Sequence, residues 1–90
     1  MTRCRYTARF LAYLKDLDRK PRERVYKTID KFQNNPSLPG LNLEKLSGHE
    51  SLWSIRITGG DRILLSKAQD EEGEIWVFEN AGPHDIYRRT

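Results

Sequence analysis

The sequence is poor in the residues that cross-link small secreted proteins or hold metal ions. It has one cysteine, Cys4, so it cannot have the internal disulfide framework of many small extracellular domains. Its two histidines, His49 and His84, are too far apart for a usual zinc-binding pattern. These absences predict a protein of a reducing compartment, the cytoplasm, that works without a metal or another cofactor.

Long hydrophobic runs are absent as well. No segment approaches the roughly 20 apolar residues that cross a bilayer, and residues 1–10 lack the uninterrupted apolar core of a signal peptide. The glycines form no phosphate-binding loop, because the pair Gly59-Gly60 lies between two strand-like runs and is typical of a turn. We therefore expect a soluble, intracellular protein without a nucleotide-binding P-loop.

Charge, by contrast, is abundant and unevenly distributed. The 90 residues are 32% charged and carry a formal net charge of +3. Residues 1–35 hold ten basic and four acidic side chains, whereas residues 36–90 hold six basic and nine acidic ones. A chain of this length is expected to form one domain, residues 1–90, with a single small core. The basic excess lies in its N-terminal part.

The N-terminal part predicts a short strand and two helices. Residues 2–6 suit an edge strand, and Thr7 is a favourable N-cap for a helix over residues 8–19. Pro21 starts a second helix, which ends at residues 34–36. Both helices have apolar residues at i, i+4, i+7 spacing: Phe10, Leu14 and Leu17, then Val25, Ile29 and Phe32. The short connection predicts an antiparallel helical hairpin.

The C-terminal part predicts strands and turns. Residues 41–48 are either irregular or a short strand, and the tail from Gly82 onward is expected to leave the sheet. Alternation and turn residues predict three strands, over residues 53–58, 62–66 and 75–78. The resulting β-α-α-β-β-β order predicts an α+β fold, in which the N-terminal edge strand joins a mainly antiparallel sheet and the helical hairpin covers one face.

The other face of the sheet is a candidate site. If Trp53, Ile55 and Ile57 face the helices, Arg56 points the other way. We expect a cationic cluster there, composed of Arg56, Arg62, His84, Tyr87 and Arg88. Such a cluster suits attack on an RNA phosphodiester: a base removes the 2′-hydroxyl proton, arginines stabilise the phosphorane, and an acid protonates the leaving oxygen. Histidine can act as acid or base near neutrality.

Structural roles are the alternatives for each of these residues. His84 alone in a tail is more often a surface residue than a catalyst. Arg56 can pair with Glu79 across the sheet, and Arg62 with Asp61 at the turn. Tyr87 can pack on the edge of the core. Spacing alone leaves these alternatives open.

The order of these segments resembles a known family. A helical hairpin is followed by Leu-Glu-Lys-Leu-Ser-Gly at 43–48, Leu-Trp-Ser-Ile-Arg-Ile-Thr at 52–58, Asp-Arg-Ile-Leu at 61–64 and His-Asp-Ile-Tyr-Arg at 84–88. This succession is similar to the RelE/ParE superfamily of type II toxin–antitoxin toxins, and it spans nearly the whole chain. The resemblance implies a RelE-like fold and a ribosome-dependent endoribonuclease that cleaves messenger RNA and is neutralised by an antitoxin.

The resemblance also implies roles for individual residues. Arg62 matches an arginine that stabilises the phosphate, and Glu44 matches a glutamate proposed as general base in some members. His84 and Tyr87 match an acid or base and a stacking or positioning group near the end of several members. Arg56, Arg88 and Lys45 are then expected to contact RNA. One departure is that Gly82-Pro83 replaces the basic residue expected just before the final motif.

Two other functions remain open at this point. The ParE-like branch of the superfamily has a similar fold but inhibits DNA gyrase. A gyrase inhibitor needs no acid/base pair, so Arg62 and His84 favour the ribonuclease. The second alternative is a non-catalytic binding module that uses the sheet only to dock an antitoxin or nucleic acid. The predicted partners are a cognate antitoxin, with which the chain forms a hetero-oligomer, and the ribosome with its mRNA.

Overall fold

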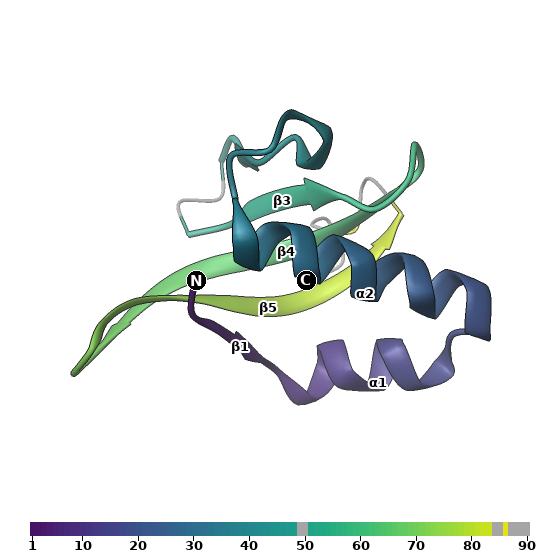
Figure 1. The fold of residues 1–90 in the computed structure, drawn as a ribbon, viewed down its shortest axis with the longest axis horizontal. Helices are drawn as coiled ribbons and strands as arrows, with labels where there is room; N and C mark the ends of the chain where they lie inside the picture. Colours follow the sequence, from purple (N-terminus) through teal and green to yellow (C-terminus); the bar gives the residue numbers. More distant parts are fainter. Residues whose placement is uncertain (49–50, 84–85, 87–90) are drawn as a thin grey trace.

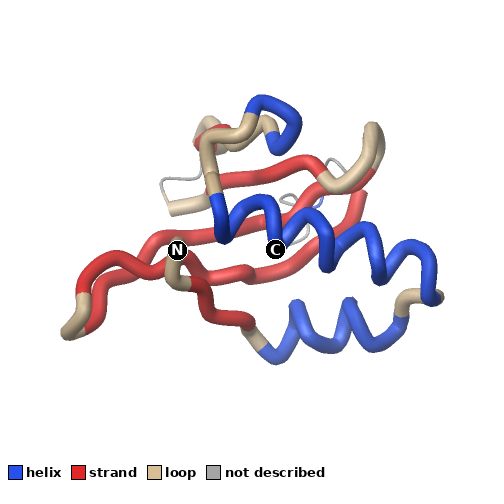
Figure 2. Tube along the Cα trace, in the orientation of Figure 1, coloured by secondary structure: helices blue, strands red, loops and turns tan. Residues whose placement is uncertain are grey.

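The computed structural model describes residues 1–48, 51–83 and 86. In chain order its elements are β1 Cys4–Tyr6, α1 Ala8–Asp16, α2 Arg19–Asn34, the 3₁₀ helix η1 Pro39–Leu41, β2 Glu44–Lys45, β3 Trp53–Arg56, β4 Asp61–Asp70 and β5 Gly73–Pro83. The helices lie against one face of a five-stranded sheet (Figures 1 and 2). The predicted α+β architecture is confirmed.

The sheet has the strand order β1-β5-β4-β3-β2. β1 is an edge strand parallel to β5, and the other pairs are antiparallel, so the prediction of a mainly antiparallel sheet with an N-terminal edge strand is correct. The segment left open as irregular or a short strand contains the two-residue strand β2. The β4–β5 hairpin is long, and its tip projects past the helices in Figure 1.

Aromatic rings dominate the core between the helices and the sheet. Phe78 of β5 is fully buried, and its ring centroid lies 5.1 Å from Tyr6, 5.4 Å from Phe10 and 5.6 Å from Phe32. These rings come from β1, α1 and α2, so Phe78 joins all three elements. Ile55 is fully buried on β3, while Trp53 and Ile57 pack against the same cluster. The predicted direction of these three side chains is therefore correct.

The first helix is shorter than predicted. α1 ends at Asp16, not near Arg19, because the chain turns there and α2 begins. The Arg22 guanidinium donates hydrogen bonds to the carbonyl oxygens of Leu14, Lys15 and Leu17, at 3.1, 3.2 and 2.6 Å. A positive group that binds the free carbonyls at a helix C-terminus stabilises that end. Arg22 thereby fixes the corner of the helical hairpin.

Thr7 joins α1 to the sheet. Its Oγ1 accepts from the Phe10 N–H at 3.1 Å, as the predicted N-cap does, and donates to the Glu79 carbonyl at 2.8 Å. Glu79 lies at a β-bulge, because Leu64 pairs with Asn80 while Leu65 pairs with Phe78. The extra residue of a bulge leaves backbone groups without ladder partners. The hydroxyl of Thr7 supplies one of these partners.

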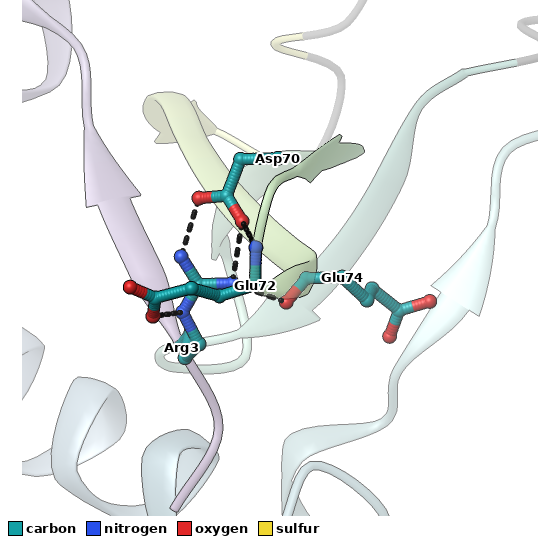
Figure 3. A network of polar contacts seen from close by, with 4 residues as sticks. All are labelled: Arg3, Asp70, Glu72 and Glu74. Carbon is teal, nitrogen blue, oxygen red and sulfur yellow. Dashed lines mark hydrogen bonds and ion pairs between the residues drawn. The ribbon is translucent and has the colours of Figure 1, made fainter.

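Arg3 ties β1 to the tip of the β4–β5 hairpin (Figure 3). Its guanidinium makes a bidentate ion pair with Asp70, in which Nη1 lies 2.9 Å from Oδ1 and Nη2 contacts Oδ2. The Glu72 backbone N–H also donates to Asp70, at 2.9 Å. The hydrogen bonds from Arg3 and from Glu72 lower the pKa of Asp70 to about 2. The projecting hairpin is thus held at its base by packing and near its tip by charge.

The prediction that the tail leaves the sheet at Gly82 is wrong. β5 continues through Pro83, with Gly82 opposite Arg62 and Pro83 opposite Asp61. Glycine and proline usually end strands, but here Gly82 allows a close approach. A Cβ at Gly82 would lie 2.9 Å from Ile86 Cδ1, so glycine leaves the space in which Ile86 packs.

In the described residues no helix is long and apolar enough to span a membrane.

Candidate functional site

Strand register brings Glu44, Arg56 and Arg62 to the sheet face opposite the helices. Arg56 pairs with Arg62, and Glu44 pairs with Ser54, two residues before Arg56. Directly paired residues share a face, and so do residues two positions apart on one strand. Because the buried Ile55 and Ile63 occupy the helix side, these three polar residues occupy the other. We call this the far face.

The centre of the far face is a like-charged pair. Arg56 and Arg62 are direct cross-strand neighbours on β3 and β4, with Cα atoms about 5 Å apart in such a pair. Within the described part of the chain, no carboxylate lies within ion-pair distance of either arginine. Like charges in this position repel and destabilise a sheet. The arrangement therefore favours a bound anion between the two guanidinium groups.

Arg62 carries the stronger sign of an incomplete site. The residue is half-buried, and its Nη1 is buried without a hydrogen-bond partner, which holds for no other buried side-chain nitrogen or oxygen in the described residues. A buried donor without an acceptor is destabilising and rare in native proteins. A phosphate oxygen would satisfy Nη1 as a charge-assisted acceptor.

The far face is less open than the sequence suggests. Ser54 and Leu64, which the register places there, are buried, and Ile86 is buried against Gly82. Ser66 donates a hydrogen bond to Glu79 at 2.6 Å, so the expected alternative of an Arg56–Glu79 pair is not what the structure shows. The cations near the proposed site are therefore Arg56 and Arg62, while the exposed Arg5, which pairs with Val77, lies at the β1 edge of the same face.

Lys45 does not join this group. It pairs with Trp53, which lies on the helix side, so the register places Lys45 on the opposite face from Glu44. Lys67 lies on the same side as Trp53, with Nζ 4.7 Å from the Trp53 ring centroid and 4.9 Å from that of Trp76. This cation–π contact was not predicted from the sequence. Alternation along β4 was the signal that could have indicated it.

The remaining predicted site residues, His84, Tyr87 and Arg88, lie outside the described residues. The described strand ends at Pro83, opposite Asp61. Within the described residues no group of three or more His, Cys, Asp and Glu side chains is arranged to hold a metal ion. Burial raises the pKa of the Cys4 thiol, which disfavours the thiolate that a cysteine nucleophile needs.

A hollow lies beside Arg56, on the side of the helices. Its volume is about 260 Å³, and its lining combines two cations with the end of α2, η1 and β3: Thr28, Lys31, Leu38, Gly40, Leu41, Arg56 and Ile57. Arg56 thus borders both the far face and the helical layer. The sequence places the basic excess in residues 1–35, but the approach of Lys31 to Arg56 depends on the tertiary structure.

Solved structures share this architecture. A YoeB/ParE toxin from Agrobacterium tumefaciens matches with a TM-score of 0.72 and 18% identity, over 92% of this chain and 99% of that one. The RelE–RelB complex from Pyrococcus horikoshii matches with a TM-score of 0.69 and 18% identity, over 91% of this chain and 93% of that one. The RelB–RelE antitoxin–toxin complex from Methanococcus jannaschii matches with a TM-score of 0.65 and 24% identity, over 94% of this chain and 96% of that one. The chain has the RelE-like fold.

Sequence comparison adds no closer relation, since no protein-family model and no curated protein matches the chain. The RelE-like fold is shared across archaeal and bacterial proteins at identities of 24% or less. At such identities the likeness concerns the backbone arrangement, and function depends on the residues that the fold carries. In this chain the RelE-like sheet carries Arg56 beside Arg62, and no described carboxylate lies within ion-pair distance of either.

Proposed function

We propose that this protein is the toxin of a type II toxin–antitoxin system and acts as a ribosome-dependent endoribonuclease on translated mRNA. The observation that carries the proposal is the Arg56–Arg62 pair, which has no described counter-ion and includes a buried donor without an acceptor. The fold that the chain shares with structures named as a YoeB/ParE toxin and a RelB–RelE antitoxin–toxin complex supports the proposal. An RNA phosphate would provide the negative charge that neither arginine receives from a described carboxylate, and an acceptor for Arg62 Nη1.

The proposed reaction is attack of a 2′-hydroxyl on the adjacent phosphorus. A base removes the 2′-hydroxyl proton, the new O–P bond forms, and the bond from phosphorus to the 5′ oxygen breaks while an acid protonates that oxygen. Arg62, with Arg56 beside it, stabilises the extra negative charge of the phosphorane. The protein's own side chains supply all the required groups.

Glu44 and His84 are the proposed acid and base. Glu44 lies on the far face two strands from Arg62, with an expected Cα separation of about 12 Å from strand spacing. A nucleotide bound between them would bring its 2′-hydroxyl within reach of a carboxylate. We assign Glu44 to the base, His84 to the acid and Tyr87 to positioning of the RNA. Arg88 and Lys45 are proposed as RNA contacts outside the reaction centre.

The proposed antitoxin has a candidate docking surface between the helices. Leu11 and Tyr26 are large apolar residues with exposed fractions of 51% and 53%, and they line two hollows between α1 and α2. Lys15 and Arg22 border one of these hollows. An antitoxin segment with apolar residues and adjacent acidic ones matches this combination. The antitoxin is encoded as a separate chain in this proposal.

Primer extension tests the proposed activity. Induction of the wild-type protein without antitoxin should stop growth and create new mRNA ends within codons. Arg62→Ala should reduce cleavage by about 10²–10³-fold, the loss expected for one transition-state donor. Arg9→Ala, which removes an exposed arginine from α1, is the control and should cleave normally.

Three other results would contradict the proposal. Unchanged cleavage by Arg62→Ala would place the site elsewhere. Double-strand DNA breaks with an SOS response and intact mRNA would indicate gyrase inhibition of the ParE type. Normal growth on expression of the folded wild-type protein would indicate a binding module without toxicity.

A further inference from the structure

A stripe of positive charge runs along α2, away from the far face. Lys20, Arg24, Lys27 and Lys31 are spaced i, i+4, i+7, i+11, and all four are exposed. This spacing places them on one side of the helix, over about 16 Å at 1.5 Å per residue. We call these four residues the α2 stripe.

No described carboxylate lies within ion-pair distance of the α2 stripe. Of the acidic residues of α2, Glu23 pairs with Arg19 at 3.1 Å, outside the stripe, and Asp30 makes no described ion pair. The described ion pairs include none of the four cations. Like charges three and four residues apart destabilise a helix, and Lys20 lies near the positive end of the helix dipole. The stripe therefore opposes the stability of the helix that carries it.

The α2 stripe is continuous with the proposed site. Lys31, its C-terminal member, lines the same hollow of about 260 Å³ as Arg56. Arg56 in turn pairs with Arg62 on the far face. Positive charge therefore extends from α2 around the β3 side of the molecule to the Arg56–Arg62 pair.

We infer that the α2 stripe is a binding track for the phosphate backbone of structured RNA and that it holds the RNA without reading its sequence. A row of cations with no apolar side chain within it fits a polyanion better than a protein surface. The exposed apolar residues of the helices, Leu11 and Tyr26, line hollows that include none of the stripe residues. This inference deepens the proposed function, because the same RNA-binding surface would position the protein for cleavage at Arg62.

Salt dependence of binding tests the track. The probe is an RNA hairpin of about 16 base pairs, made with 2′-O-methyl nucleotides so that it cannot be cleaved, and binding is followed by fluorescence anisotropy from about 50 to about 200 mM salt. The variant R24Q/K27Q/K31Q should bind at least about tenfold more weakly, with a log–log salt slope smaller by about 2–3. The single change R56Q should reduce the slope by about 1.

The control variant R5Q/R9Q/K15Q removes the same charge from exposed cations outside the stripe. It should lose less than about threefold in affinity, with a slope change below about 1. Equal losses in the two triple variants would show that net charge alone acts, and would overturn the track. Circular dichroism should show that the stripe variant is folded and at least as heat-stable as the wild type, because it has lost internal repulsion.

Two comparisons define what the track binds. The stripe variant should lose the same affinity for a DNA duplex of the same length, since the contact is to phosphates. If the variant lost affinity for DNA but none for RNA, the assignment to RNA would be overturned. Weaker antitoxin binding with unchanged RNA binding would assign the stripe to a protein partner and overturn the inference. Because the probe cannot be cleaved, failure of the proposed reaction at Arg62 would leave the result at the stripe unaffected.

Discussion

The two faces of the sheet differ in whether their side chains have partners among the described residues. On the helix side, Phe78 is fully buried and has aromatic neighbours from β1, α1 and α2. On the far face, Arg56 and Arg62 lie side by side without a described counter-ion, and Arg62 Nη1 is buried without an acceptor. The first face is complete within the chain and serves stability. The second lacks a partner among the described residues, as a surface that binds an anion would.

The largest expected effect comes from truncating neighbouring residues of β5, one on each face, to alanine. Phe78→Ala removes the ring that three elements share, and should lower the free energy of unfolding by about 3–5 kcal/mol. Val77→Ala, on the next residue and the other face, should lower it by about 1 kcal/mol or less. Urea denaturation followed by circular dichroism measures both.

A domain of this size is only marginally stable, so Phe78→Ala can fail to fold altogether. Phe78→Leu keeps an apolar side chain of intermediate size and should give a measurable loss of about 1–2 kcal/mol. If Val77→Ala were as damaging as Phe78→Leu, the far face would carry as much of the core as the helix side, and the contrast would be wrong.

A smaller effect is expected at Thr7, which joins α1 to the bulge of the sheet. Thr7→Ala removes both the N-cap acceptor and the donor to the Glu79 carbonyl. The expected loss is about 1–2 kcal/mol of unfolding free energy. Thr7→Ser keeps the hydroxyl and should retain most of the stability in the same urea titration. An equal loss in Thr7→Ser would show that the methyl group, and not the hydrogen bonds, matters.

On the far face, substitution of an arginine should raise the stability of the protein instead of lowering it. Arg56→Glu replaces the like-charged pair with an opposite-charged one beside Arg62, and should raise stability by up to about 1 kcal/mol. It should also weaken RNA binding, because the new carboxylate occupies Arg62 and repels phosphate. Thermal denaturation and anisotropy measure the two effects, with Arg56→Gln as the uncharged control. Lower stability for Arg56→Glu than for Arg56→Gln would contradict direct pairing with Arg62.

Local sequence patterns were sufficient to predict which side chains lie on the helix side of the sheet. The apolar spacing that includes Phe10 and Phe32 predicted which helix faces are buried, and alternation around Ile55 predicted the direction of Arg56. Both are regularities within one element, so they depend on backbone geometry alone. The family resemblance added the fold, which comparison with solved structures confirms.

The composition of the far face depends on contacts between elements, and the sequence could not supply these. The face on which Lys45 lies depends on the register of a two-residue strand, and a shift by one residue would reverse it. Gly82 and Pro83 are residues that usually end a strand, yet pairing with Arg62 and Asp61 continues through them. The predicted roles of Glu44, Arg62 and the other site residues stay predictions.

The smallest expected effect concerns the ion pair between Arg3 and Asp70 at the projecting hairpin. The pKa of Asp70 falls from 3.8 to about 2 in the folded chain, first through the hydrogen bond from Arg3 and then through the Glu72 N–H. A lowered folded-state pKa stabilises the protein above the unfolded-state value, and this contribution is lost as the pH falls toward 2. Asp70→Asn should therefore melt at a lower temperature than the wild type at pH 7, and the melting temperatures of the two proteins should converge near pH 2.

Glu71→Gln is the control for this prediction. It alters a neighbouring exposed carboxylate that has no ion-pair partner among the described residues, and its melting temperature should follow that of the wild type throughout. A constant gap between Asp70→Asn and the wild type from pH 7 to pH 2 would mean that the carboxylate charge is not the cause. Because the pair is exposed, added salt should also narrow the gap at pH 7, whereas the effect of Phe78→Ala on the buried core should persist.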